Sequence, residues 1–223
     1  GMDGSLSVLR ENSRKIGQIR RSHFPQKEFW MTETTGAQWN NELWHTYGWS
    51  PELTEFDKAM LAAQYAHITL ADAQANVFMW WGLIYSLAPE FVKNPKIREK
   101  HRDEGLLLVK EKVGLKGRQE LVERTKKFFM IKQYSRFITS GFRRISVNSA
   151  DPLWVSAFYN ESNETGVIVA INPSTQPTSL AFTLPEGMKT TEAYQTDNQL
   201  DCEKVAPRSV LPGRSVRTIL YSL

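Results

Sequence analysis

The pattern of apolar residues changes near residue 141, and this change limits the fold more than any other feature of the sequence. Before it, stretches with helical spacing at 5–22, 50–74 and 118–138 alternate with apolar runs at 28–33 and 76–85. Such alternation is typical of βα units with buried parallel strands. From Phe142 onward, short strand-like runs follow one another between turn residues, as in a β-sandwich. The sequence therefore predicts an α/β domain over 1–141 and a β-sandwich over 142–223.

Turn and capping residues support these boundaries. Ser50 followed by Pro51 predicts the start of the second helix, because proline suits the first helical position. Gly141 follows the third helical stretch and predicts its end. The strand-like runs after it are RRISVNS, LWVSAFYN, GVIVAINP, LAFTLP, TEAYQT and SVRTILYSL.

Charge and apolar run length exclude several classes of protein. The net charge is +4, with 23 basic and 16 acidic residues over 1–144 and 5 basic and 8 acidic residues over 145–223. The basic excess is interspersed with acidic residues and lacks a nucleic-acid motif, so no nucleic-acid partner is expected. The longest apolar run, over 76–89, is too short to span a bilayer. Cys202 is the single cysteine, so no internal disulfide forms.

The start of the sequence leaves the compartment open. No charged segment precedes an apolar run there, so the pattern of a secretory signal peptide is not seen. Gly1 before Met2 resembles the remnant of a tag.

Glu33 is the most unusual charge in the α/β part. It lies at the end of the run KEFWMTETT, where Phe29 to Met31 read as a short buried strand and Gly36 breaks the pattern. The local pattern alone favours a surface glutamate at a strand end over a functional one.

Five stretches in order resemble the carboxy-terminal half of glycoside hydrolase family 30, which includes glucosylceramidases, β-1,6-glucanases and xylanases. They are FWMTET, FMWWGL, KKFFMIKQYSRFITSGFRRI, VIVAINPS and SVLPGRSVRTILYSL. The resemblance covers nearly the whole chain from about Phe24. It implies a retaining β-glycosidase built on a (β/α)₈ barrel with an attached antiparallel β-sandwich. A complete barrel needs about 250 residues, so this chain is expected to contain only a partial barrel segment.

The family resemblance also implies roles for individual residues. Glu33 takes the place of the nucleophile at the end of the seventh barrel strand, and barrel active sites do lie at the carboxyl ends of strands. Trp81 matches the aromatic residue at the floor of a sugar subsite, and Trp80 is its neighbour on the opposite face of the strand. The acid/base glutamate of the family ends an earlier strand that this chain lacks. The chain alone is therefore expected to be inactive.

The segment after Glu33 is dense in aromatic residues. It holds Trp39, Trp44, His45, Tyr47 and Trp49, which suit either sugar stacking or a lid packed on its own side chains. No partner stands at metal-ligand spacing from His45, so it is expected to hydrogen-bond in a pocket. No metal and no cofactor are expected. Glu42 and Glu90 lie in loops without the family context, and neither is expected to be catalytic.

Two readings of the function remain open. One is part of a retaining glycosidase that acts on a carbohydrate; the other is a non-catalytic carbohydrate-binding or structural module. Family members specific for glucuronic-acid-bearing xylan carry two arginines soon after the Trp-Trp strand, whereas this sequence reads WWGLIYS, which disfavours that substrate. A homo-oligomer is also expected, because an incomplete barrel would expose apolar side chains such as Met60, Leu61 and Ile68.

Overall fold

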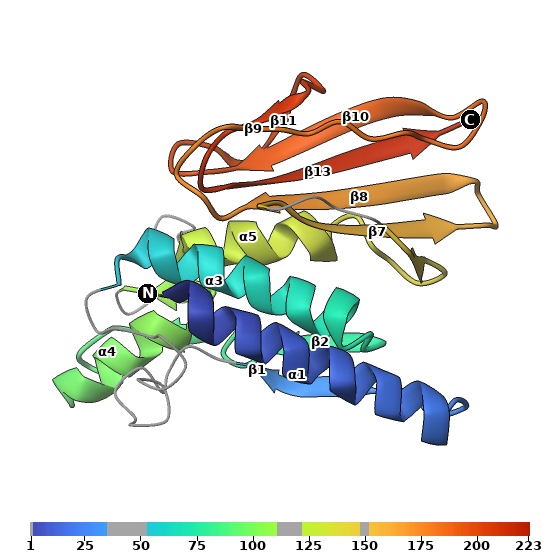
Figure 1. Cartoon of the computed structure of the whole chain (residues 1–223). Coiled ribbons are helices and arrows are strands. Elements are labelled where there is room, and N and C mark those ends of the chain that lie inside the picture. Colours follow the sequence, from blue (N-terminus) through green and yellow to red (C-terminus); the bar gives the residue numbers. More distant parts are fainter. Residues whose placement is uncertain (1, 35–52, 111–121, 148–151) are drawn as a thin grey trace. The chain divides into compact units, whose positions relative to one another are not determined.

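The computed structural model describes residues 2–34, 53–110, 122–147 and 152–223. The chain forms two compact units, one of residues 1–59 and 68–128 and one of residues 60–67 and 129–223. In the described residues, the first unit contains the sheets β1-β2 and β3-β4-β5, and the second contains a six-stranded sheet and the pair β12-β9 (Figure 1). The predicted combination of an α/β part and a largely antiparallel β part is confirmed.

The first unit begins with α1 (Met2–His23), followed by β1 (Trp30–Thr34). The helix α3 (Glu55–His67), whose residues 60–67 belong to the second unit, continues into a π-helical turn, η1 (Ile68–Asp72), which leads to β2 (Val77–Trp80). β1 and β2 pair in parallel. This agrees with the helix–strand–helix–strand order expected from the sequence.

Asp72 connects α1 to η1. Its carboxylate accepts hydrogen bonds from Arg10 Nε at 2.7 Å and from Arg14 Nε at 3.0 Å. Gly17 permits the close approach of the two elements, because a Cβ at this position would lie 2.8 Å from the carbonyl oxygen of Ala73. A larger residue at position 17 would therefore push α1 away from η1.

The remainder of the first unit is a small mixed sheet with one helix. β3 (Ile84–Ser86) pairs in parallel with β4 (Leu107–Val109), which pairs antiparallel with β5 (Val122–Arg124). Between β3 and β4 lies α4 (Pro95–Glu104). Asn94 caps this helix by accepting a hydrogen bond from the Lys96 amide at 2.9 Å, and Pro95 occupies the first turn.

Three sequence predictions in this part of the chain were wrong in detail. The run 76–85 forms two strands of different sheets, because the chain turns at Gly82, which has φ +94°. The predicted helix over 118–138 is shorter: residues 122–124 pair with β4 as β5, and α5 covers Lys126–Ser135. The second helix begins at Glu55, after Thr54 and Asp57 exchange backbone and side-chain hydrogen bonds at 2.8 and 3.1 Å.

The second unit is dominated by a sheet with the strand order β11-β10-β13-β8-β7-β6. Its strands are β6 (Arg143–Ile145), β7 (Trp154–Asn160), β8 (Thr165–Asn172), β10 (Lys189–Thr196), β11 (Asp201–Val205) and β13 (Ser215–Ser222), all antiparallel to their neighbours. Gln133 of α5 attaches that helix to the sheet. Its side chain donates to Thr196 Oγ1 at 2.7 Å and accepts from Thr218 Oγ1 at 2.5 Å.

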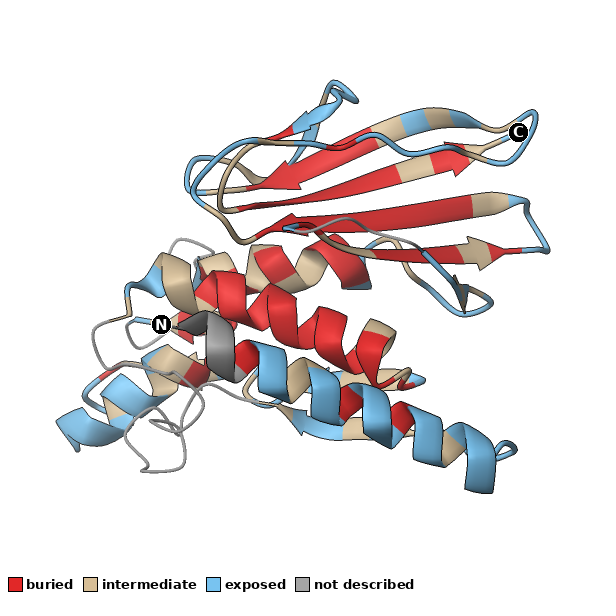
Figure 2. Ribbon diagram, in the orientation of Figure 1, coloured by how far each residue is buried: buried red, intermediate tan, exposed pale blue. Residues whose placement is uncertain are grey.

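The two central strands carry most of the core of this sheet, as Figure 2 shows for β8 and β13. The core cluster also includes Leu180 and Leu211. Leu180 directly follows β9 (Thr178–Ser179), and Leu211 lies in β12 (Val210–Leu211), which pairs with β9. The predicted strand LAFTLP is wrong, since residues 180–185 form no strand. The strands β9, β11 and β12 were not predicted.

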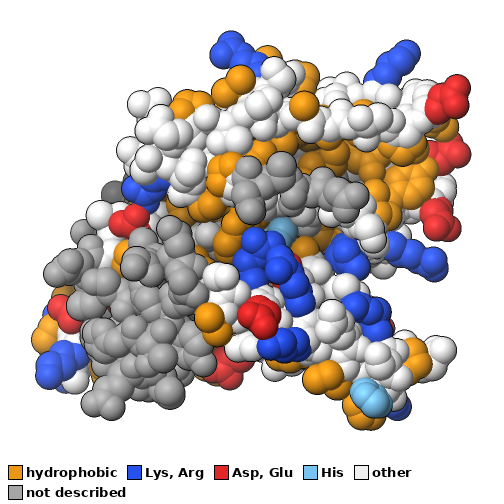
Figure 3. Space-filling model, viewed as in Figure 1, with side chains coloured by type: hydrophobic (Ala, Val, Ile, Leu, Met, Phe, Trp, Pro, Cys, Tyr) orange, Lys and Arg blue, Asp and Glu red, His pale blue; other side chains and the backbone are white. Residues whose placement is uncertain are grey.

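An apolar cavity of about 590 Å³ lies against the same sheet. Its walls include Val155, Ile168, Leu180, Leu184 and Tyr221. Figure 3 shows hydrophobic side chains at the surface near β7 and β8. By contrast, Met60, Leu61 and Ile68, which were expected to be exposed, are all buried.

Candidate functional site

The parallel pair β1-β2 contains an irregularity at the position of Glu33. Trp30 pairs with Val77 and Met31 with Phe78, but the next pair joins Thr34 to Trp80. Between these pairs β1 advances by three residues while β2 advances by two. The extra residue is a β-bulge, a feature that re-aims a side chain and is common beside active sites.

The bulge interrupts the alternation of side chains around Glu33. Paired residues of neighbouring strands point to the same face, so Met31, Phe78, Thr34 and Trp80 share one face. All four are half-buried. Strict alternation from Met31 would have placed Glu33 with them. The opposite face carries Met79, and the bulge interrupts the alternation between Met31 and Thr34, where Glu33 lies.

That opposite face carries Trp81. The backbone amide of Trp81 donates to the carbonyl oxygen of Thr34 at 2.8 Å, which extends the pairing one residue beyond β2. Trp81 is 49% exposed, and Met79, on the same face, is 42% exposed. Glu33 is also exposed. The carboxyl ends of two adjacent parallel strands thus carry an exposed carboxylate and an exposed indole.

Trp80 lies on the face that carries Phe78 and Thr34, and a hydrogen bond fixes its side chain. Its indole Nε1 donates to the backbone carbonyl of Glu104 at 2.7 Å. This hydrogen bond attaches the end of α4 to the end of β2. The predicted site residues Trp39, Trp44, His45 and Tyr47, like Glu42, lie outside the described residues.

Three further residues gather beside Trp81 that the sequence analysis did not select. A Cβ at Gly82 would lie 2.5 Å from Cε2 of Tyr85 and 3.3 Å from Cβ of Glu104, so both side chains lie over this glycine. The ring of His101 stacks on that of Tyr85, with centroids 4.2 Å apart and planes 10° apart. The available signal was the tyrosine three residues after the glycine in WWGLIYS.

The environment of Tyr85 favours its neutral form. Burial raises the pKa of the Tyr85 hydroxyl, and the negative charge of Glu104 raises it further. Glu104 itself is only 3% exposed, and its carboxylate lies 3.8 Å from Lys100 Nζ. Tyr85 is therefore a neutral hydrogen-bonding group at neutral pH.

The described residues hold no group of three or more His, Cys, Asp or Glu side chains arranged to bind a metal ion. Within the same residues, no helix is both long enough and apolar enough to cross a membrane.

Comparison with solved structures gives the fold a context. Similar folds occur in a glycoside hydrolase family 30 subfamily 8 xylanase from Clostridium acetobutylicum (21% identity, TM-score 0.61) and a family 30 endoxylanase from Clostridium papyrosolvens (17% identity, TM-score 0.59). The matches cover 88% and 95% of this chain. A conserved exported protein from Bacteroides fragilis matches 96% of this chain at 19% identity with a TM-score of 0.69.

The chain spans less than half of these structures, namely 43%, 46% and 43% of their respective lengths. No family model and no curated protein sequence matches it. The chain therefore has part of a glycoside hydrolase fold, and the structural likeness establishes the fold alone.

Proposed function

We propose that this chain is the carboxy-terminal part of a retaining β-glycosidase related to glycoside hydrolase family 30, with Glu33 as its nucleophile. The observation that supports the proposal is the bulge in β1, which lies between Met31 and Thr34 and so includes Glu33 at the carboxyl end of a parallel strand. A surface glutamate at a strand end would need no such irregularity.

In the proposed reaction, a carboxylate oxygen of Glu33 attacks the anomeric carbon of a β-linked sugar. The bond to the leaving oxygen breaks as that oxygen receives a proton from a second carboxyl group, and water later hydrolyses the glycosyl-enzyme. The second carboxyl must lie about 5–5.5 Å from the nucleophile. The family resemblance assigns it to an earlier barrel strand, outside this chain.

Trp81 is the proposed sugar platform. An exposed indole face can cover the apolar C–H face of a pyranose while polar groups at its rim fix the hydroxyls. Its exposure of 49% leaves room for such a ligand. Trp39, Trp44, His45 and Tyr47 are proposed to line the same site, and the half-buried Trp80 to support it from the opposite face. A neutral sugar suits the site better than a glucuronic-acid-bearing xylan.

The alternative is a carbohydrate-binding or structural module without catalysis. The reading frame upstream of this chain separates the two readings. Further βα units with an Asn-Glu pair at the end of a fourth strand would favour the enzyme, and a natural start at Met2 would favour the module.

The test uses the longer protein encoded by the extended reading frame and a 2-fluoro glycoside that traps the glycosyl-enzyme. Intact mass spectrometry should show one added sugar in the unmodified protein and none in Glu33→Gln. Glu90→Gln is the matched control, since Glu90 is an exposed glutamate in a turn, and it should label normally. Labelling of Glu33→Gln to the normal extent would overturn the assignment of the nucleophile.

A further inference from the structure

A small polar pocket lies where α1 meets the end of η1. Its volume is about 260 Å³, below the range of about 300–1,000 Å³ that is usual for drug-sized ligands, so it suits a small ion or a single functional group. The residues that line it are Arg14, Gln18, Arg21, Ala71, Asp72 and Gln74. All of them belong to the first unit, so the pocket is formed within that unit.

One wall of the pocket is a polar stripe of α1. Arg14, Gln18 and Arg21 are four and three residues apart, a spacing that places them on one face of the helix. Gly17 lies beside this stripe and lets α1 approach η1 closely, because a Cβ there would lie 2.8 Å from the carbonyl oxygen of Ala73. The close packing of the two elements holds the walls of the pocket in place.

The charge around the pocket is positive. Asp72 is the acidic residue in the lining, and it is buried. Its Oδ2 accepts from Arg10 Nε at 2.7 Å, and its Oδ1 accepts from Arg14 Nε at 3.0 Å. Together with Arg21, these arginines carry three positive charges against one negative charge. The surplus of two exceeds the partial negative charge of about one half at the carboxyl end of a helix, so the pocket favours an anion.

Several N–H donors of the lining are not used by the fold. Arg14 uses Nε for Asp72, and its side chain is 53% exposed. Within the described part of the chain, Gln18, Arg21 and Gln74 form no side-chain hydrogen bond. A guanidinium presents its N–H groups in a fork that matches the oxygens of a phosphate or sulfate group, and a carboxamide adds two further donors. The donor set therefore fits an oxyanion.

The backbone is unusual at two points of the pocket. η1 is a π-helical turn over Ile68–Asp72, a rare conformation that is frequent at functional sites. Gln74 follows it with φ +57°, a left-handed conformation that residues other than glycine seldom adopt. Strain of this kind is concentrated at active sites and ligand-binding sites. A glutamine at a position that suits glycine is explained if its carboxamide contacts a ligand.

We propose that this pocket binds a small tetrahedral oxyanion, namely a phosphate or sulfate group. Arg14 and Arg21 supply the charged donors. The carboxamides of Gln18 and Gln74 supply neutral donors beside them. The same chemistry is presented by a free ion and by an ester group of a larger molecule. The proposal does not depend on the catalytic role proposed for Glu33.

The experiment is a titration of the full 223-residue chain with inorganic phosphate, followed in ¹⁵N–¹H spectra at constant ionic strength. The side-chain amide signals of Gln18 and Gln74, assigned from Gln18→Ala and Gln74→Gly, should shift together and saturate with one dissociation constant. Arg21→Gln removes a charged donor that holds no other described residue. This variant should stay folded and bind phosphate about tenfold to a hundredfold more weakly, as expected for one lost hydrogen bond to a charged group.

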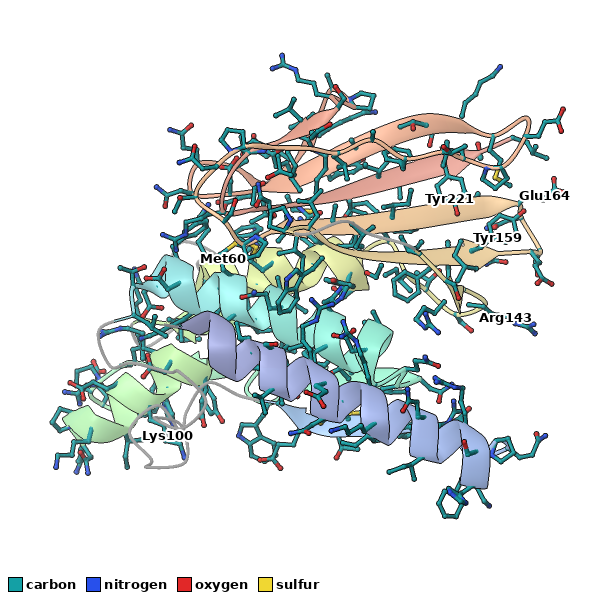
Figure 4. The ribbon with its side chains drawn as sticks, viewed as in Figure 1. Met60, Lys100, Arg143, Tyr159, Glu164 and Tyr221 are labelled. Atoms are coloured by element: carbon teal, nitrogen blue, oxygen red, sulfur yellow. The ribbon has the colours of Figure 1, made fainter. Side chains whose placement is uncertain are left out.

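Arg143→Gln is the matched control, since Arg143 is an exposed arginine of β6 (Figure 4). It loses the same charge and should leave the dissociation constant unchanged. Glucose 6-phosphate is the second probe: tighter binding than inorganic phosphate would support the site and identify an ester as its ligand, and weaker binding would support the site and identify the free ion. The absence of a saturable shift with either probe, or equal weakening in Arg21→Gln and Arg143→Gln, would overturn the proposal.

Discussion

At the scale of single residues, Lys127 is unusual because it is a buried charge. Its side chain is 1% exposed, and Nζ lies 3.3 Å from Glu55 and 3.2 Å from the carbonyl oxygen of Arg102. The carboxylate of Glu55 also forms an ion pair with Lys58, with Nζ 3.0 Å from Oε1. Burial lowers the pKa of Lys127 more than the charge of Glu55 raises it. Folding therefore carries a cost for keeping this lysine charged.

The lowered pKa predicts how stability depends on pH. Between the lowered pKa of the folded state and the ordinary value of 10.5, the unfolded state binds more protons at Lys127, so this residue makes stability rise with pH. Lys127→Met should remove that rise, as urea unfolding at pH 7, 9 and 10 would show. Lys189→Met, at an exposed position of β10, should retain it. Equal slopes for both variants would contradict the prediction.

At the scale of elements, periodicity predicted which segments are helices and strands better than where they end. The helix over 5–22 and five of the six runs after residue 141 are confirmed as α1, β6, β7, β8, β10 and β13. Errors arose where tertiary pairing overrode local preference, as at residues 122–124, which join β4 instead of a helix.

The candidate site was predictable only in part, for the same reason. Glu33 at a strand end and two adjacent tryptophans can be read directly from the sequence. The bulge cannot, because it is a property of the pairing between β1 and β2 rather than of either strand. Likewise Glu104 reaches the site through the packing of α4, far along the chain from Glu33.

The turn between β7 and β8 allows a prediction for one element. Glu164 lies there (Figure 4) with φ +53°, a conformation that costs an L-residue about 1–2 kcal/mol. Glycine adopts it freely but loses about 0.5–1 kcal/mol of backbone entropy. Glu164→Gly should thus raise the free energy of unfolding by up to about 1 kcal/mol. Glu161→Gly, in the same turn but with no positive φ, should lower it; urea titrations compare the two.

At the scale of the whole molecule, exposed apolar surface predicts self-association. Near the candidate site, Trp30 is 51% exposed, Leu83 58% and Ile84 56%, and the six-stranded sheet adds its apolar cavity. Monomers seldom expose apolar patches larger than a few hundred Å². The chain should therefore form dimers or larger oligomers, with a mass that rises with concentration in light scattering. A constant monomer mass up to high concentration would contradict this.

The last prediction is that the isolated chain does not hydrolyse β-glycosides. General acid assistance contributes about 10²–10⁴-fold to such reactions, and this chain is proposed to lack the acid. Groups from the absent part of the fold would also orient the sugar, so proximity is lost along with the proton donor.

An aryl glycoside with a good leaving group separates these two losses. Such a substrate needs no acid but still needs the pocket, so the isolated chain should turn it over no faster than its Glu33→Gln variant does. The longer protein should hydrolyse it, because the orienting groups are then present. Hydrolysis by the 223-residue chain at the rate of the longer protein would mean that residues within this chain supply both the pocket and the proton, and the proposed division of the active site would then be wrong.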